Sequence, residues 1–175
     1  MSRRAKKPQA GRRLTLARHR AMQALYQWQA TGHSAAQIEL QFLPPETDEP
    51  PEAESAVEPD RELEDATDMA DADQNLFREL LYGVMDRLED WDAQIVPHLD
   101  RALKSLDPVE RVILRMGTYE LNERLQVPYR VVINEYVELA KLFGAEDSYK
   151  YINGVLDKVA RGNRFRVAEM QTRQR

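Results

Sequence analysis

The chain has 175 residues, 42% of them apolar and none of them cysteine. This length fits one folded domain with a mobile appendage and leaves no room for a separate large catalytic module, and the lack of cysteine excludes disulfides, thiolate metal sites and cysteine nucleophiles. No apolar run approaches the roughly 18 residues of a membrane-spanning helix, and no apolar segment follows the N-terminal charges, so we expect a cytoplasmic protein without membrane contact.

The net charge of −5 conceals a strong segregation of charge along the sequence. Residues 44–73 hold thirteen acidic residues against one arginine, so the rest of the chain carries a net +7. Eight basic residues and no acidic ones precede residue 21, and five arginines follow residue 160. A basic arm is typical of nucleic-acid-binding proteins, because each neutralised phosphate releases counterions. A solubilising tail is the alternative interpretation.

The composition predicts three regions: a flexible basic arm over residues 1–11, a helical domain over 12–162 and a basic tail over 163–175. Within the domain, residues 44–73 contain five prolines and few apolar side chains. Such a segment cannot offset the entropy lost on ordering, so we expect a disordered acidic insertion. It would serve as a solvated linker or as an RNA mimic that folds back on the arm.

The first predicted helix runs from about Arg12 to Thr31 and is ended by Gly32. Helical spacing places one apolar stripe toward the core, formed by Leu14, Ala17, Ala21, Ala24, Leu25 and Trp28. A second face carries Arg12, His19, Gln23 and Tyr26. That mixture of charge, hydrogen-bonding groups and an aromatic ring suits an RNA surface better than a core.

The next elements are predicted from capping signals. Ser34 followed by Gln37 indicates a capping box and a short helix that Pro44 and Pro45 end. A third helix is predicted to begin near Asp73 and to continue or break near Trp91, before Pro97 limits or kinks it.

A strong helix start follows at Asp107-Pro108, with a carboxylate at the N-cap and proline at the first helical position. This helix has a core stripe and a second strip, which consists of Glu110, Leu114, Gly117 and Leu121. Two apolar strips indicate either a central helix of a bundle or a helix that buries one strip against a partner.

Two more helices are predicted, one opened by Val127-Pro128-Tyr129 and ended by Gly144, and one from Asp147 or Ser148 to Gly162. Six or seven helices with short connections predict an all-α fold. Tyr151 lies beside the buried stripe of the last helix, next to Gly154. Its ring either stacks on a nucleic-acid base or seals the edge of the core.

No arrangement of residues predicts catalysis. His19, His33 and His98 are dispersed without a metal-binding spacing, and neither a Gly-rich phosphate loop nor a serine nucleophile motif occurs. We therefore expect a binding protein rather than an enzyme, with no cofactor and no metal.

Four segments together resemble the NusB family of bacterial transcription antitermination factors. They are AMQALYQW at 21–28, DPVER at 107–111, VPYRVVINE at 127–135 and FGAEDSYKYINGVLDK at 143–158. The resemblance covers most of residues 17–31 and 76–160. It implies an all-α fold of two small packed helical subdomains and a protein that binds the boxA element of nascent RNA together with NusE, a small ribosomal protein. RNA polymerase, an indirect partner, then passes terminators, notably in ribosomal RNA operons.

The resemblance also implies site residues. RNA contacts would come from the arginine-rich N-terminus and first helix, and from the last inter-helix turn: Arg12, Arg13, Arg18, Gln23, Tyr26, Asp147, Lys150 and Tyr151. The NusE-facing position falls on Glu110, which gives the second strip a partner and leads us to expect a binding surface made of Glu110, Leu114, Arg115 and Leu121. The stretch Leu14-Thr15-Leu16 departs from the basic residues found there in relatives, which leaves the register of the arm on RNA open.

Three alternatives remain at this point. Similar helical modules precede the catalytic domains of RNA cytosine methyltransferases, although this chain lacks the cysteine nucleophile. A scaffold that binds only proteins would use its basic ends merely for solubility. The protein is expected to be a monomer or a homodimer, since RNA-binding and partner strips are also able to self-associate.

Overall fold

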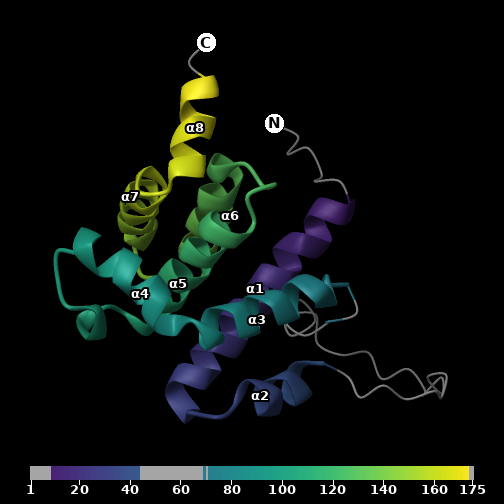
Figure 1. Cartoon of the computed structure of the whole chain (residues 1–175). Coiled ribbons are helices and arrows are strands. Elements are labelled where there is room, and N and C mark those ends of the chain that lie inside the picture. Colours follow the sequence, from purple (N-terminus) through teal and green to yellow (C-terminus); the bar gives the residue numbers. More distant parts are fainter. Residues whose placement is uncertain (1–8, 44–68, 70, 174–175) are drawn as a thin grey trace, which may run out of the picture.

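The computed structural model describes residues 9–43, 69 and 71–173, and these residues form helices joined by short connections (Figure 1). The α-helices are α1 (Gln9–Thr31), α2 (Ala35–Phe42), α3 (Gln74–Asp86), α4 (Leu88–Ile95), α5 (Pro108–Glu123), α6 (Tyr129–Phe143), α7 (Ser148–Arg161) and α8 (Arg164–Thr172). Two 3-10 turns, η2 (Val96–His98) and η3 (Leu103–Ser105), connect α4 to α5. The predicted all-α fold is confirmed.

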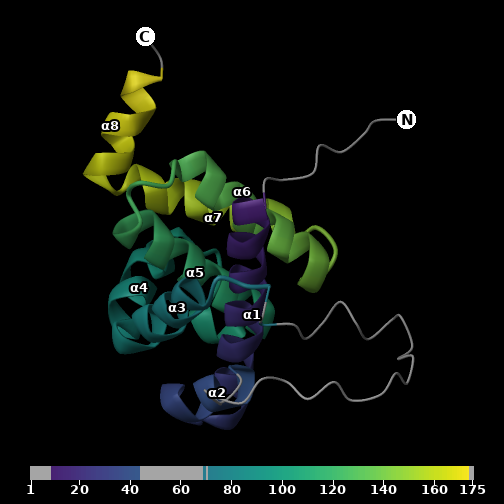
Figure 2. The ribbon, with the colours of Figure 1, turned by 90° about the vertical axis from the view of Figure 1, so that its right-hand side faces the viewer.

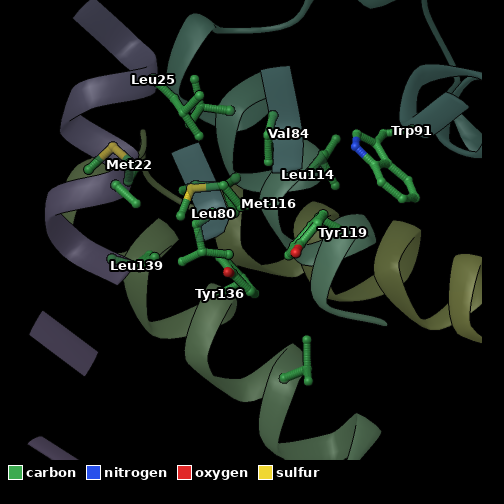
Figure 3. Close-up of a cluster of buried hydrophobic side chains, with 14 of the residues drawn as sticks. Met22, Leu25, Leu80, Val84, Trp91, Leu114, Met116, Tyr119, Tyr136 and Leu139 are labelled. Carbon is green, nitrogen blue, oxygen red and sulfur yellow. The ribbon is translucent and has the colours of Figure 1, made fainter. Parts of the chain in front are cut away.

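The helices form two packed groups that share one core. Helices α1, α2 and α3 contact one another, as do α5, α6 and α7. Helix α5 joins the groups, because it also packs against α1, α3 and α4. Figure 3 shows side chains of α1, α3, α5 and α6 converging on this core, together with Trp91 of α4. Burial of these apolar side chains is the main source of stability, because each fully buried large side chain contributes about 1.5–3 kcal/mol.

Local capping chemistry sets several helix starts as predicted. The Ser34 side chain and the Gln37 side chain form both hydrogen bonds of a capping box at α2. The Asp107 carboxylate accepts a hydrogen bond from the Val109 backbone N–H at 2.8 Å, and Pro108 occupies the first position of α5. These signals act within one turn of helix, so they are readable without the tertiary structure.

The third predicted helix is two helices, because the backbone leaves helical geometry at Arg87 (φ −128°, ψ 38°). The break folds α4 back so that the Trp91 ring is completely buried and its indole N–H donates to the Gly83 carbonyl at 2.9 Å. Gly83 also lies against the Tyr119 ring, where a Cβ atom would approach a ring carbon to 2.2 Å. The break therefore packs α4 onto α5.

Three predicted region boundaries differ from the structure. Residues 1–8, 44–68, 70 and 174–175 lie outside the described part of the chain. The predicted arm over 1–11 overlaps α1, which begins at Gln9. The last residues of the predicted insertion over 44–73 belong to the folded domain. Met69 and Ala72 are buried, and the Asp73 carboxylate caps α3 by accepting a hydrogen bond from the Leu76 backbone N–H at 2.9 Å. Met69 and Ala72 belong to the hydrophobic core, and the Asp73 backbone N–H donates to the Arg13 carbonyl of α1 at 3.0 Å.

The predicted basic tail over 163–175 contains α8, which leads from the end of α7 toward the C-terminus (Figure 1). Its Arg166 is fully buried and donates to the backbone carbonyls of Glu120, Leu121, Arg124 and Val127 at 2.7–3.3 Å. The last carbonyls of a helix have no partner within the helix, and a guanidinium offers five donors. Arg166 thus satisfies the C-terminal end of α5 and fixes α8 to the domain.

No helix within the described ranges has the length and apolarity needed to cross a bilayer.

Candidate nucleic-acid interface

The outer face of α1 carries four of the five predicted RNA-contacting residues of the first helix, all except Arg18. Arg12 and Arg13 are exposed, and the Tyr26 side chain is 44% exposed. Gln23 is half-buried, and its side-chain oxygen accepts a hydrogen bond from Arg20 at 2.8 Å. Because that bond uses only the oxygen, the Gln23 amide keeps its two N–H donors for a ligand.

The turn between α6 and α7 presents a second set of predicted groups. Asp147 has a left-handed backbone (φ 62°), which a non-glycine residue rarely adopts. Its exposed carboxylate lies 3.3 Å from the exposed Lys150 ammonium, and this hydrogen bond raises the pKa of Lys150. The left-handed residue turns the chain sharply between the two helices, so that Asp147 and Lys150 stand together in solvent.

The Tyr151 side chain on α7 is half-buried, and residues from another part of the chain contact it. Its hydroxyl donates to the Asp100 carboxylate at 3.0 Å, and the Arg101 guanidinium lies 5.0 Å from the centre of its ring. The space at Gly154 is open, since a Cβ atom there would meet nothing within 4 Å. Tyr151 is thus an anchored ring with open space beside it.

Asp100 and Arg101 belong to this interface, although sequence reasoning missed them. The Asp100 carboxylate accepts hydrogen bonds from the Arg101 side chain and from the Tyr151 hydroxyl. These bonds, of which that from Arg101 has the larger effect, lower the pKa of Asp100 to about 2. Both residues lie in the connection between η2 and η3, about fifty positions before Tyr151. No local pattern marks them, because only the packing of that connection against α7 brings them to the ring.

A direct contact joins the two sets of groups. The His19 ring on α1 and the Phe143 ring at the end of α6 meet edge to face, with their centres 5.7 Å apart. In Figure 2, α1 lies in front of α6, and the His19–Phe143 contact places the C-terminal end of α6, which leads into the α6–α7 turn, next to α1. The helix that carries the first set of predicted residues therefore contacts the helix that leads into the turn with the second set.

Arg18 was predicted to contact RNA, and the structure contradicts this. The residue is 3% exposed, and its guanidinium donates two hydrogen bonds of 2.8 Å to the Glu120 carboxylate on α5. Tyr136 donates to the same carboxylate, and Glu135 lies 3.8 Å from the guanidinium. Burial alone lowers the pKa of Arg18, but the hydrogen bonds and charge of Glu120 raise it above its ordinary value. Arg18 ties α1 to the core and has no access to a phosphate.

The predicted partner-binding strip on α5 is also wrong. Leu114 and Leu121 are completely buried, and a Cβ atom on Gly117 would lie 2.8 Å from the Leu156 side chain of α7. The strip is covered because α5 is surrounded by other helices of the same chain. The other interpretation of the two apolar strips, a central helix, is the correct one.

The two polar members of that predicted surface have partners inside the protein. The Glu110 carboxylate is 9% exposed and accepts a hydrogen bond of 2.7 Å from the Ser148 hydroxyl. Arg115 is 8% exposed and forms a two-bond ion pair with Asp92, while Gln29 accepts a third bond at 2.9 Å. Glu110 and Arg115 therefore fix α7, α4 and α1 to α5 instead of offering a docking surface.

Within the described ranges, no cluster of three or more histidine, aspartate or glutamate side chains is arranged to hold a metal ion. The interface presents the cations of Arg12, Arg13 and Lys150, the Gln23 amide and two tyrosine rings, which suit the binding of phosphates and bases, together with the carboxylates of Asp147 and Asp100.

Comparisons with known proteins identify the family and the fold of the chain. The NusB family model matches residues 15–161. A transcription antitermination protein NusB from Alkalilimnicola ehrlichii is 49% identical over 166 residues, which cover 94% of this chain and 90% of that protein. One from Haemophilus influenzae is 44% identical over 155 residues, covering 89% and 91%. The solved structure of T. maritima NusB superposes with a TM-score of 0.66 at 26% identity, covering 90% of this chain and 93% of that one.

Proposed function

The chain belongs to the NusB family of transcription antitermination proteins, and from this premise we propose that it is a non-catalytic RNA adaptor. It holds a boxA-like single-stranded RNA together with NusE and thereby lets RNA polymerase read through terminators, notably in ribosomal RNA operons. It acts on the elongation complex indirectly, through the RNA and NusE, and needs no cofactor.

The observation that carries this proposal is the contact between His19 and Phe143. This contact joins α1, which carries one set of the proposed RNA-binding residues, to the end of α6, which leads into the turn with the other set. The two sets come from segments more than one hundred positions apart in the sequence. A single strand of RNA is long and flexible enough to touch both sets at once, and it exposes both its phosphates and its base faces.

Each group has a role in the proposed complex. Arg12 and Arg13 neutralise phosphates on α1, and Lys150 neutralises one at the α6–α7 turn. Tyr26 and Tyr151 offer rings to bases, which is worth about 1–3 kcal/mol for each stacked base. The N–H donors of Gln23 and the carboxylate of Asp147 face base edges, where amides and carboxylates read donors and acceptors.

NusE binding is proposed from the family relationship. We do not propose Leu114 and Leu121 as its docking surface, because both side chains are buried within this chain.

The test is a titration of labelled boxA-like RNA with the protein, alone and with NusE, at two salt concentrations. The proposal expects binding that weakens steeply with salt and that NusE strengthens. Replacing exposed Arg12 by alanine should reduce the slope of log affinity against log salt by about 0.7, the value for one phosphate of a single strand. The matched control is Arg164→Ala, which removes an exposed arginine on α8 and should leave the slope unchanged.

The stacking role of Tyr151 has its own pair of variants. Tyr151→Ala should weaken RNA binding by about 1–3 kcal/mol, whereas Tyr151→Phe keeps the ring, loses the hydroxyl contact with Asp100 and should retain most of the affinity. Equal affinity of the alanine variant and the wild type would remove the stacking role. A wild-type protein that binds NusE but ignores RNA would overturn the adaptor function itself.

A further inference from the structure

A polar groove lies between α6 and α7, outside the interface described above. It has a volume of about 400 Å³ and is lined by Arg130 and Asn134 from α6 and by Asn153 and Arg161 from α7, among others. These positions lie within the two sequence motifs VPYRVVINE and YINGVLDK and just after the second, and the interface uses none of the four.

The two asparagines are available to a ligand. Asn134 and Asn153 are both exposed, and neither side chain forms a hydrogen bond in the described part of the chain. An asparagine amide offers two donors and one acceptor in one plane, which matches the paired donor and acceptor on the edge of a nucleic-acid base.

The two arginines are held in place by one end of each guanidinium. The Arg130 Nε donates to the Tyr129 hydroxyl at 3.1 Å, and the Arg161 Nε donates to the Asp157 carboxylate at 2.9 Å. The structure gives their terminal nitrogens no other hydrogen bond within the described ranges. Those nitrogens are the ones that a planar guanidinium uses to hold a phosphate. Arg161 also neutralises the carboxylate of Asp157, which lines the groove.

The groove also has an apolar surface between its polar groups. Ile133 is 7% exposed and Val137 is half-buried, and both line the groove from α6. An apolar surface flanked by amides and guanidinium groups matches the three parts of a nucleotide: the face of the base, its edge and its phosphate.

The groove continues the surface that Lys150 begins. Lys150, Asn153, Asp157 and Arg161 follow one another on α7 at spacings of three and four, so they share one face of that helix. At 1.5 Å per residue, this strip spans about 16 Å along the helix axis, a length that a few nucleotides of an extended strand cover. We propose that the α6–α7 groove binds nucleotides of the RNA beyond those held at α1 and the α6–α7 turn.

This inference rests on the proposed RNA-binding function, and the test separates the two. Binding is measured for a short boxA-like RNA and for RNAs extended by about three nucleotides at the 5′ or the 3′ end. The variant is the double substitution Asn134→Ala and Asn153→Ala. Its matched control is Gln126→Ala with Gln171→Ala, which removes two exposed amides elsewhere on the surface. Thermal unfolding verifies that both variants fold like the wild type.

We expect the wild type and the control to bind one extended RNA more tightly than the short one. The asparagine variant should lose about fivefold to tenfold of affinity for that extended RNA and bind the short RNA like the wild type. An extension that adds no affinity to the wild type, or an asparagine variant that keeps the full gain, would overturn the groove proposal and leave the groove to a protein segment. Failure of the wild type to bind even the short RNA would instead refute the proposed function, and the groove proposal with it.

Discussion

Replacing Arg18 tests whether this arginine stabilises the fold or contacts RNA. Arg18→Met keeps much of the side-chain length but leaves the fully buried Glu120 carboxylate without its main partner. Removing one member of a buried ion pair costs about 3–5 kcal/mol. The Tyr136 hydroxyl still donates to Glu120, and Arg124 remains 3.4 Å away, so we expect a loss near the lower end, about 3 kcal/mol. For a domain of this size, that loss lowers Tm by roughly 6–12 °C.

The assay combines urea unfolding, followed by circular dichroism, with RNA titration under conditions where the variant is folded. Arg18→Met should unfold at lower urea concentration and bind RNA with unchanged salt dependence. Arg12→Ala, the matched surface variant, should keep its stability within about 0.5 kcal/mol and lose RNA affinity. Adding Glu120→Gln to Arg18→Met should recover part of the stability, because it removes the unpaired charge. The reasoning is refuted if Arg18→Met has wild-type stability and a reduced salt dependence of RNA binding.

Three other predictions concern stability and ionisation. Gly83→Ala places a Cβ atom 2.2 Å from a Tyr119 ring carbon and should cost about 1–3 kcal/mol in thermal unfolding; an unchanged Tm would mean that the ring moves away freely. Arg166→Met removes the donors to four backbone carbonyls of the α5 end and the following turn, and should destabilise the domain by about 3 kcal/mol or more and speed amide exchange in α8. Slow exchange in α8 of that variant would contradict the anchoring role. The Asp100 pKa of about 2 lies below the ordinary 3.8, first because of the Arg101 side chain and then because of the Tyr151 hydroxyl, so both contacts should be intact above pH 4 and weaken only as the pH falls toward 2. An NMR titration of the Asp100 carboxyl with a midpoint near 3.8 would argue against these two contacts.

The amino-acid sequence alone determined the helical class and many of the element boundaries. Apolar residues at helical spacing, the capping box of Ser34 and Gln37, and Asp107 before Pro108 act within one or two turns of helix. Their effect does not depend on the rest of the chain. For the same reason, the exposed polar face of α1, with Arg12 and Tyr26, was predictable from periodicity.

Only the tertiary structure decided which charged residues reach solvent. Arg18 and Glu120 are 102 positions apart and form a buried pair, and Arg166 belongs to the core although its neighbours in sequence are those of a basic tail. Asp100 and Arg101 reach Tyr151 only because a long connection folds onto α7. An arginine carries the same charge on a surface as in a core, and its environment depends on which distant helix packs against it. That packing arises from the burial of the whole apolar surface at once, which no local pattern encodes.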